Sequence, residues 1–198
     1  MSGLYRAQKT FAGFVEALPG IKPTSMLDIG SGRAVKSLLI ADHYKIGRVH
    51  LMDGTGGSCK DTGNNGGYTE KVPEAWSDVR DGYNNFVARL PHVECHWHIA
   101  DPNLVIPPVD LIVSFRSWGH HFNINAYTDL ARRCLTDNGL VVTDIRRRTE
   151  GEERMIAAGF VTVMQIPNES EKARRLVFKL SEAYLAKRAR VESAPPTA

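Results

Sequence analysis

The alternation of short apolar segments with amphipathic ones is the feature that most constrains how this chain can fold. Seven apolar segments are predicted to be strands: residues 25–29, 48–53, 93–100, 109–115, 140–145, 160–166 and 176–180. Helical spacing of apolar side chains covers residues 34–43, 73–90, 124–135 and 150–158 between them. Strands that alternate with helices form mostly parallel sheets with helices packed on both faces. The sequence therefore predicts a doubly wound α/β fold with a mostly parallel, seven-stranded sheet.

The length of 198 residues favours a single domain, which we assign to residues 1–182. Residues 1–20 form an N-terminal helix that Pro19 and Gly20 end. The Gly- and Asn-rich loop 54–71 is long for a compact domain, and long loops are often functional, so we expect it to be either a lid over the cofactor or disordered. Residues 183–198 form a basic, partly disordered tail.

The composition is that of a soluble globular protein, with 42% hydrophobic and 24% charged residues. No apolar run reaches the ~20 residues of a membrane-spanning helix, so we expect no membrane association. The three cysteines are widely spaced and form no C-x-x-C pair, which predicts free thiols, a cytoplasmic protein and no metal site. The net charge of +3 is too small to indicate a partner, and nothing in the sequence predicts an oligomeric state.

Glycines and acidic residues follow the first three predicted strands. The turn Gly30-Ser31-Gly32 follows Asp28 at the end of the first strand, and Asp53 and Asp101 end the next two. In open α/β sheets, ligands bind beyond the carboxyl ends of the strands. Glycines there let the backbone approach a ligand, and a carboxylate can accept hydrogen bonds from ribose hydroxyls or an adenine amino group. This arrangement predicts a nucleoside-binding site in a Rossmann-like fold.

The glycine turn also restricts which nucleoside is bound. A dinucleotide fingerprint has Gly or Ala at its third position, where this chain has Val35, and the P-loop pattern is absent. A carboxylate at Asp28 is unfavourable beside a pyrophosphate but favourable beside a cation. S-adenosylmethionine carries an ammonium and a sulfonium group, so the sequence favours it over NAD.

These segments resemble the cofactor motifs of class I S-adenosylmethionine-dependent methyltransferases. The resemblance lies in residues 27–32, in Asp53 and Asp101, and in strands 109–114 and 139–142, and it extends over residues 24–180. It implies that Gly30, Ser31 and Gly32 line the aminoacyl part of the cofactor, that Asp53 binds its ribose and that Asp101 binds its adenine. It also implies that Ser114 and Phe115 lie against the cofactor. We add Asp28 and Gly54 to this cofactor site.

The segment 117–122, Ser-Trp-Gly-His-His-Phe, together with Tyr127, resembles a run in sugar O-methyltransferases. His121 matches the histidine of that run, whereas His120 replaces an aromatic residue. A hydroxyl acceptor benefits from a general base, and neutral histidine is available near neutral pH. We therefore expect His121 to be the base, with His120 as the alternative.

Four residues are candidates for contact with the substrate. Arg116 either orients an anionic group or pairs with Asp110 or Asp129, and Trp118 either stacks on a sugar or fills the core. Tyr68 or Trp76 would lie near the substrate when the lid covers the cofactor. We expect the substrate pocket to be built from the N-terminal helix, residues 54–76 and residues 116–127.

The sequence thus predicts methyl transfer to a small-molecule acceptor, at a hydroxyl group. Residues 114–117, Ser-Phe-Arg-Ser, lack the N/D-P-P-Y/F run of enzymes that methylate amino groups of bases. One alternative is an RNA methyltransferase that uses Arg146–Arg148 and the basic C-terminal region, although nucleic acid is not the favoured partner. Another is a cofactor-binding partner subunit without catalysis, and a dehydrogenase is a distant fourth.

Overall fold

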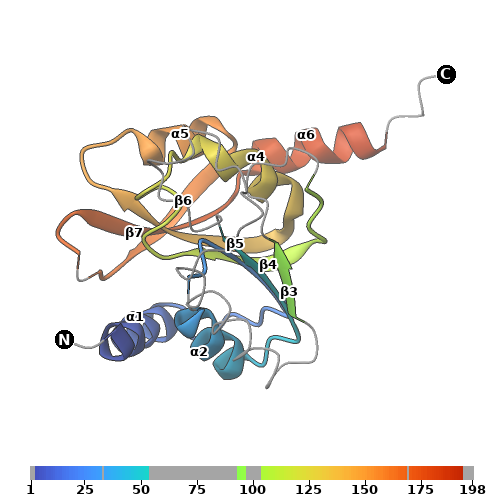
Figure 1. Cartoon of the computed structure of the whole chain (residues 1–198). Coiled ribbons are helices and arrows are strands. Elements are labelled where there is room, and N and C mark those ends of the chain that lie inside the picture. The colour runs from blue at the N-terminus through green and yellow to red at the C-terminus, as the bar shows by residue number, and fades with distance from the viewer. Residues whose placement is uncertain (1–2, 33, 54–92, 97–103, 169, 194–198) are drawn as a thin grey trace, which may run out of the picture.

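The computed structural model describes residues 3–32, 34–53, 93–96, 104–168 and 170–193, which build one sheet with helices on both sides (Figure 1). The strand order is β3-β2-β1-β4-β5-β7-β6. The strands are β1 (Ser25–Ile29), β2 (Arg48–Met52), β3 (Val93–His96), β4 (Val109–Ser114), β5 (Leu135–Arg146), β6 (Phe160–Ile166) and β7 (Ala173–Leu180). The predicted helix 73–90 and loop 54–71 lie outside the described residues.

Strands β3, β2, β1, β4 and β5 pair in parallel, and β7 runs antiparallel to both β5 and β6. The sequence did not reveal the direction of β7. The reason is the connection from β6, residues 167–172, which is too short for the crossover that a parallel neighbour requires. Strand order reverses between β1 and β4, and open α/β sheets bind ligands at such a point, beyond the carboxyl ends of the strands.

The helices lie in two layers. Helices α1 (Gly3–Ala17) and α2 (Val35–Tyr44) cover one face of the sheet, and α4 (Asn125–Cys134), α5 (Gly151–Ala157) and α6 (Glu182–Glu192) cover the other (Figure 1). The predicted doubly wound arrangement is therefore confirmed. No helix among the described segments is long and apolar enough to cross a bilayer.

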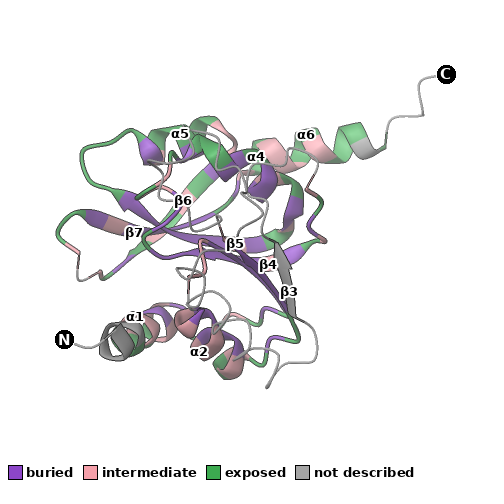
Figure 2. Cartoon of the chain, viewed as in Figure 1, coloured by how far each residue is buried: buried purple, intermediate pink, exposed green. Residues whose placement is uncertain are grey.

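Two apolar cores form, one on each face of the sheet, and the strands between them are buried on both sides (Figure 2). Strand β4 shows why the sequence is apolar throughout: Ile112 faces the α4 side, whereas Leu111 and Val113 face α1 and α2. Strands that are buried on both faces have nearly continuous apolar sequences instead of alternating ones. On the α1 side, Phe14 is fully buried.

Strand β5 begins earlier than the sequence predicts. Helix α4 ends at Cys134 because Leu135 is extended (φ −75°, ψ 130°), and Leu135 already pairs with Val109. The next pair is Leu111 with Leu140, so residues 136–139 bulge out of the ladder. The residues predicted to be a helix-ending turn, 137–139, therefore form an irregularity inside β5.

Helix α6 belongs to the segment that was predicted to be a basic tail. Tyr184 and Leu185 pack against the core on the α4 side, and the Arg188 guanidinium donates to the Leu135 carbonyl at 3.1 Å. The tail thus begins with a helix attached to the domain. The domain boundary at residue 182 stays a prediction.

Candidate functional site at the carboxyl ends of the strands

The glycine turn is tied to the end of β2. Backbone N–H groups of Gly30 and Ser31 donate to the Met52 carbonyl at 2.6 and 3.2 Å, and the Gly32 N–H donates to Asp53 Oδ2 at 2.5 Å. Gly30 and Gly32 have φ values of +76° and +52°. Residues other than glycine rarely adopt this left-handed backbone region. The structure therefore brings together the turn and Asp53, two features that the sequence assigned to one ligand.

Asp28 lies beneath this turn, at 3% exposure, and accepts a hydrogen bond from the Ser37 hydroxyl of α2. Burial raises the pKa of Asp28 from 3.8 to about 7, because loss of water disfavours the carboxylate more than Ser37 and Lys36 favour it. Asp53 adds to this rise as a neighbouring negative charge. The Asp28 side chain is thus buried and hydrogen-bonded to α2.

The end of β4 is fastened to β1. The Ser114 hydroxyl donates to the Ile29 carbonyl at 2.8 Å and accepts from the Trp118 N–H at 2.9 Å. Gly30 touches the same loop: a Cβ built at Gly30 would lie 1.8 Å from Ser117 Oγ. Ser114 therefore holds the turn and the loop after β4 together, and its hydroxyl is engaged within the protein.

Phe115 lies on the α2 side of this loop at 6% exposure. Lys36 Nζ is 5.2 Å and Arg175 Cζ is 4.8 Å from the centre of its ring, both within cation–π range. Burial lowers the pKa of Lys36, and the nearby Arg175 and Arg116 charges act in the same direction, whereas Asp28 and Asp144 oppose it. Phe115 is thus a buried ring in contact with two cations.

Trp118 is a core residue, and its prediction as a substrate contact is wrong. The side chain is fully buried, its indole N–H donates to the Ile124 carbonyl, and its ring packs edge-on against Tyr127 at 6.3 Å. The Thr143 hydroxyl donates to the Trp118 carbonyl at 2.6 Å. An apolar ring with its only donor satisfied inside the core cannot reach a substrate, so the alternative that Trp118 fills the core is confirmed.

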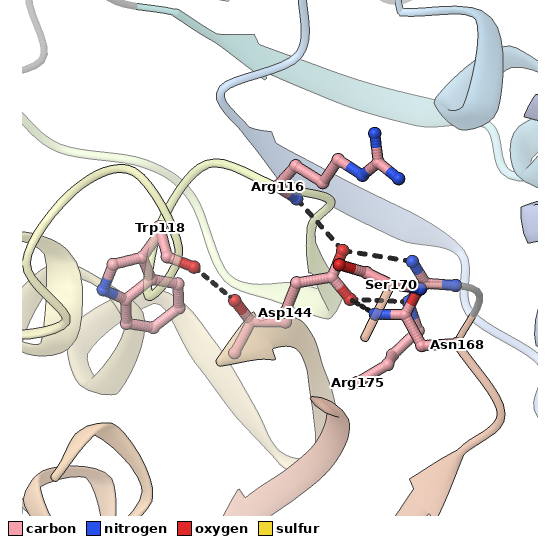
Figure 3. Close-up of polar contacts among 7 residues, drawn as sticks. Arg116, Trp118, Asp144, Asn168, Ser170 and Arg175 are labelled. Atoms are coloured by element: carbon pink, nitrogen blue, oxygen red, sulfur yellow. Dashed lines mark hydrogen bonds and ion pairs between the residues drawn. The ribbon is translucent and has the colours of Figure 1, made fainter. Parts of the chain in front are cut away.

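Arg116 is fixed through its backbone, which has a left-handed φ of 63° and donates its N–H to Asp144 Oδ2 at 3.1 Å. Figure 3 shows its side chain extending away from Asp144. The pairings with Asp110 or Asp129 are wrong. Asp110 accepts from Thr24, Ser25 and Thr136, and Asp129 pairs with Arg132.

Asp144 organises a buried network that sequence reasoning missed (Figure 3). It is fully buried near the end of β5 and pairs with Arg175 of β7, at 2.9 Å to Nε and 3.1 Å to Nη2. Asn168 donates to it at 3.2 Å. The signal in the sequence is an aspartate at the end of the apolar run 140–145, but its partners come from segments 24 to 31 residues away.

A pocket of about 270 Å³ lies at the carboxyl ends of β4 and β5, on the α4 side. Its lining consists of residues 119–124, followed by Arg146, Thr149, Glu150, Gly151 and Arg154. Both candidate histidines are in this lining. The sequence predicted residues 116–127 here but missed the contribution of β5 and α5, and α1 takes no part in this pocket.

The two histidines differ within this pocket. His121 is exposed, whereas His120 is half-buried, and the buried Nδ1 of His120 has no hydrogen-bond partner among the described residues. Their rings pack edge-on with centroids 4.5 Å apart. Burial and the neighbouring His121 hold the pKa of His120 below its ordinary value. His120 is therefore neutral near neutral pH.

Several predicted site residues lie outside the described residues. These are Gly54, Tyr68, Trp76 and Asp101, together with the rest of the loop 54–71. In the segments that the structure does describe, no three potential ligands gather in a way that would hold a metal ion.

No family model matches the sequence, and no curated protein is significantly similar to it. Solved structures do match. The ribosomal protein L11 methylase of Lactobacillus delbrueckii subsp. bulgaricus matches with a TM-score of 0.60 and 14% identity, over 90% of this chain and 80% of that one. The precorrin-6y C5,15-methyltransferase of Geobacter metallireducens GS-15 matches with a TM-score of 0.59 and 19% identity, over 88% of this chain and 89% of that one. An S-adenosylmethionine-dependent methyltransferase of Clostridium acetobutylicum ATCC 824 matches with a TM-score of 0.61 and 11% identity, over 88% of this chain and 92% of that one.

The chain has the class I S-adenosylmethionine-dependent methyltransferase fold. In this methyltransferase fold, the glycine turn after β1 and Asp53 after β2 stand together at the carboxyl ends of the parallel strands. The resemblance seen in the sequence is thereby confirmed at the level of fold.

The residues of the glycine turn fit an adenosyl cofactor. Ser31 Oγ is buried without a hydrogen-bond partner among the described residues, and a Cβ added at Gly32 would meet no atom within 4 Å. An unpaired buried hydroxyl and an open backbone beside a carboxylate offer polar groups and space to a ligand. S-adenosylmethionine, with its ribose hydroxyls and cationic aminoacyl end, matches both.

Proposed function

We propose that this protein transfers the methyl group of S-adenosylmethionine to a hydroxyl of a small molecule held in the pocket beside the glycine turn. The observation that carries this proposal is the position of the pocket. Ser117 touches Gly30 on one side, and its carbonyl accepts the N–H groups of His120 and His121 on the other, at 3.1 and 2.8 Å. One residue thus separates the cofactor turn from two potential bases.

Within this proposal, Gly30, Ser31 and Gly32 line the aminoacyl end of the cofactor, and Asp53 accepts from its ribose. When bound, S-adenosylmethionine supplies an electrophilic methyl group on a sulfonium sulfur. The rest of the cofactor is the leaving group, a neutral thioether. The protein aligns the acceptor oxygen with the S–CH₃ bond, and such positioning lowers the barrier by restricting the reactants before reaction. Asp101 and Gly54 stay assigned to the cofactor on sequence grounds alone.

We assign the general base to His120. Its depressed pKa keeps the imidazole neutral, and the residue lines the pocket, where a neutral ring nitrogen can take the hydroxyl proton. The proton passes from the acceptor oxygen to the imidazole while that oxygen takes up the methyl group. His121, which the sequence favours, also lines the pocket and is the competing assignment.

Calorimetry with S-adenosylmethionine, S-adenosylhomocysteine and NAD tests the cofactor. We expect both adenosyl ligands to bind and NAD not to bind. Asp53→Ala should weaken adenosyl binding by about 1–3 kcal/mol, the cost of losing a buried hydrogen-bond partner. Unchanged affinity in this variant would remove Asp53 from the site, and absence of adenosyl binding in a folded sample would contradict the proposal as a whole.

His120→Gln tests the base, with His121→Gln as its matched partner. We expect kcat for methyl transfer to fall by roughly 10²–10⁴-fold in His120→Gln, with adenosyl affinity unchanged. The same loss in His121→Gln alone would move the base to His121. Full turnover in both variants would show that positioning suffices and that neither histidine is a base.

RNA is the alternative acceptor, because Arg146, Arg147 and Arg148 are exposed at the end of β5 beside the pocket. Contacts to phosphates release counterions, so RNA binding falls steeply with salt. A steep salt dependence with methyl transfer to RNA would favour this alternative. Adenosyl binding without turnover on small molecules or RNA would indicate the non-catalytic partner subunit.

A further inference from the structure

We infer that the pocket after β4 and β5 selects an anionic acceptor, a hydroxylated carboxylate or phosphate whose negative group pairs with Arg146. This inference rests on the proposed function, because it names the class of acceptor for the same pocket. It begins with the charges that line the pocket, which are Arg146, Glu150 and Arg154.

Within the described residues, only one of these charges lacks a partner. Glu150 Oε2 and Arg154 Nη2 pair at 3.1 Å, so these two compensate each other. The Arg146 guanidinium, in contrast, has no ion-pair or hydrogen-bond partner within the described part of the chain. The described lining therefore has a surplus positive charge, located at Arg146. A guanidinium presents a planar fork of donors that matches carboxylates and phosphates.

The backbone holds Arg146 at the rim while its side chain stays exposed. Its N–H donates to the Gly119 carbonyl at 3.0 Å, and it pairs with Ala173 of β7. Gly119 has a φ of +86°, and an added Cβ would lie 2.8 Å from Ile145 Cδ1 and 3.1 Å from the Asp144 carbonyl. This close approach fixes the loop that carries His120 against the strand end that carries Arg146. The backbone segments that carry the cation and the imidazole are thus joined directly.

The nearest buried carboxylate does not cancel the charge of Arg146. Asp144 precedes it by two residues, but both of its oxygens are engaged by the Arg175 guanidinium. The volume of about 270 Å³ is close to the lower end of the roughly 300–1,000 Å³ of pockets that bind small molecules. A compact acid with a hydroxyl therefore fits the charge and the size of the pocket together.

Binding of matched probes to the full chain, saturated with S-adenosylhomocysteine, tests the inference by calorimetry. The carboxylate arm compares 4-hydroxybenzoate with neutral 4-hydroxybenzamide, and the phosphate arm compares glucose 6-phosphate with glucose. We expect at least one anion to bind tenfold or more tightly than its neutral partner. The arm that shows the preference identifies the kind of anion.

Arg146→Gln should abolish this preference, and Arg147→Gln is the matched control, because it removes the same charge from the neighbouring residue, which does not line the pocket. Equal binding of anionic and neutral probes, no binding of any probe, or equal losses in both variants would overturn the inference. Binding of an RNA oligonucleotide in place of the anionic probes would overturn it too.

The same samples separate this inference from the proposed function. S-adenosylhomocysteine binding with no anion preference would overturn the inference alone. Anion preference at the pocket with no adenosyl binding would overturn the proposed function and leave the anion site. Circular dichroism melting of both variants verifies that each is folded, and because both arginines are exposed we expect unchanged melting temperatures.

Discussion

Asp144 and Arg175 form a bidentate ion pair inside the sheet, joining Oδ1 to Nε at 2.9 Å and Oδ2 to Nη2 at 3.1 Å. The two residues face each other across the antiparallel strands β5 and β7, and their side chains are 0% and 4% exposed. Asp144 also receives the Arg116 N–H, so the pair supports the loop that carries the histidines. Removing one partner would leave the other charge buried and unpaired, which is far more costly than losing an exposed pair.

Arg175→Met should therefore destabilise the protein by about 3–5 kcal/mol, measured by urea unfolding. Arg174→Met is the control on the same strand, since Arg174 pairs with Glu152 at 2.8 Å where both side chains are partly exposed. There we expect a loss of at most about 1 kcal/mol. Similar losses in the two variants would contradict the special role of the buried pair.

Asp28→Asn should alter how stability depends on pH. The pKa of Asp28 is about 7 in the folded protein and 3.8 in the unfolded chain, so the folded state retains a proton that the unfolded state releases. The free energy of unfolding thus falls as pH rises from about 4 to 7, by at most about 1.4 kcal/mol per pH unit from this residue. Asparagine stays neutral and removes this slope. Denaturant unfolding between pH 5 and 8 measures the difference.

The exposed Asp129→Asn serves as the control for Asp28→Asn, because its carboxylate is 78% exposed and removing it leaves the buried acid intact. We expect Asp129→Asn to keep the slope of the unchanged protein between pH 5 and 7. Parallel pH profiles for all three proteins would show that Asp28 does not hold its proton in the folded state.

Gly30→Ala should disrupt the glycine turn. The new Cβ would overlap Ser117 Oγ at 1.8 Å and Ser117 Cβ at 2.2 Å, and the φ of +76° would be strained as well. We expect a loss of about 2–4 kcal/mol in stability from these two effects. Gly32→Ala has a comparable φ of +52° but meets no atom within 4 Å, so only the backbone strain of about 1 kcal/mol remains.

Ser117→Gly provides the rescue for Gly30→Ala, because it removes both of the atoms that the alanine would strike. The double variant should recover the steric part of the loss and retain the backbone part, as judged by a double-mutant cycle of unfolding free energies. Additive effects would show that the two residues do not touch.

Lys45→Gly should stabilise the protein. Lys45 ends α2 in the left-handed region, with φ 57° and ψ 43°, and its side chain is exposed. Glycine adopts this conformation without a Cβ clash, so we expect a gain of about 0.5–1 kcal/mol and a melting temperature higher by about 1–4 °C. Lys45→Ala removes the same charge but keeps a Cβ, and we expect no gain from it. A gain in both variants would attribute the effect to charge.

The sequence predicted the alternation of elements and the glycine turn because both depend on local pattern. Buried strands such as β4 are continuously apolar, and a turn such as Gly30-Ser31-Gly32 requires residues that tolerate positive φ. It also placed the two histidines after β4, where they line a pocket. These features come from residues close together in the chain, so spacing and residue type were sufficient to find them.

The tertiary structure alone decided the direction of β7, the buried state of Trp118 and the partners of Asp144. Each of these depends on segments that are distant in sequence: Arg175 reaches Asp144 only after β7 returns antiparallel beside β5. Arg146 likewise joins the histidines through a hydrogen bond to Gly119, 27 residues earlier. A single sequence records which side chains exist, whereas their pairing depends on which distant strands the packed sheet brings together.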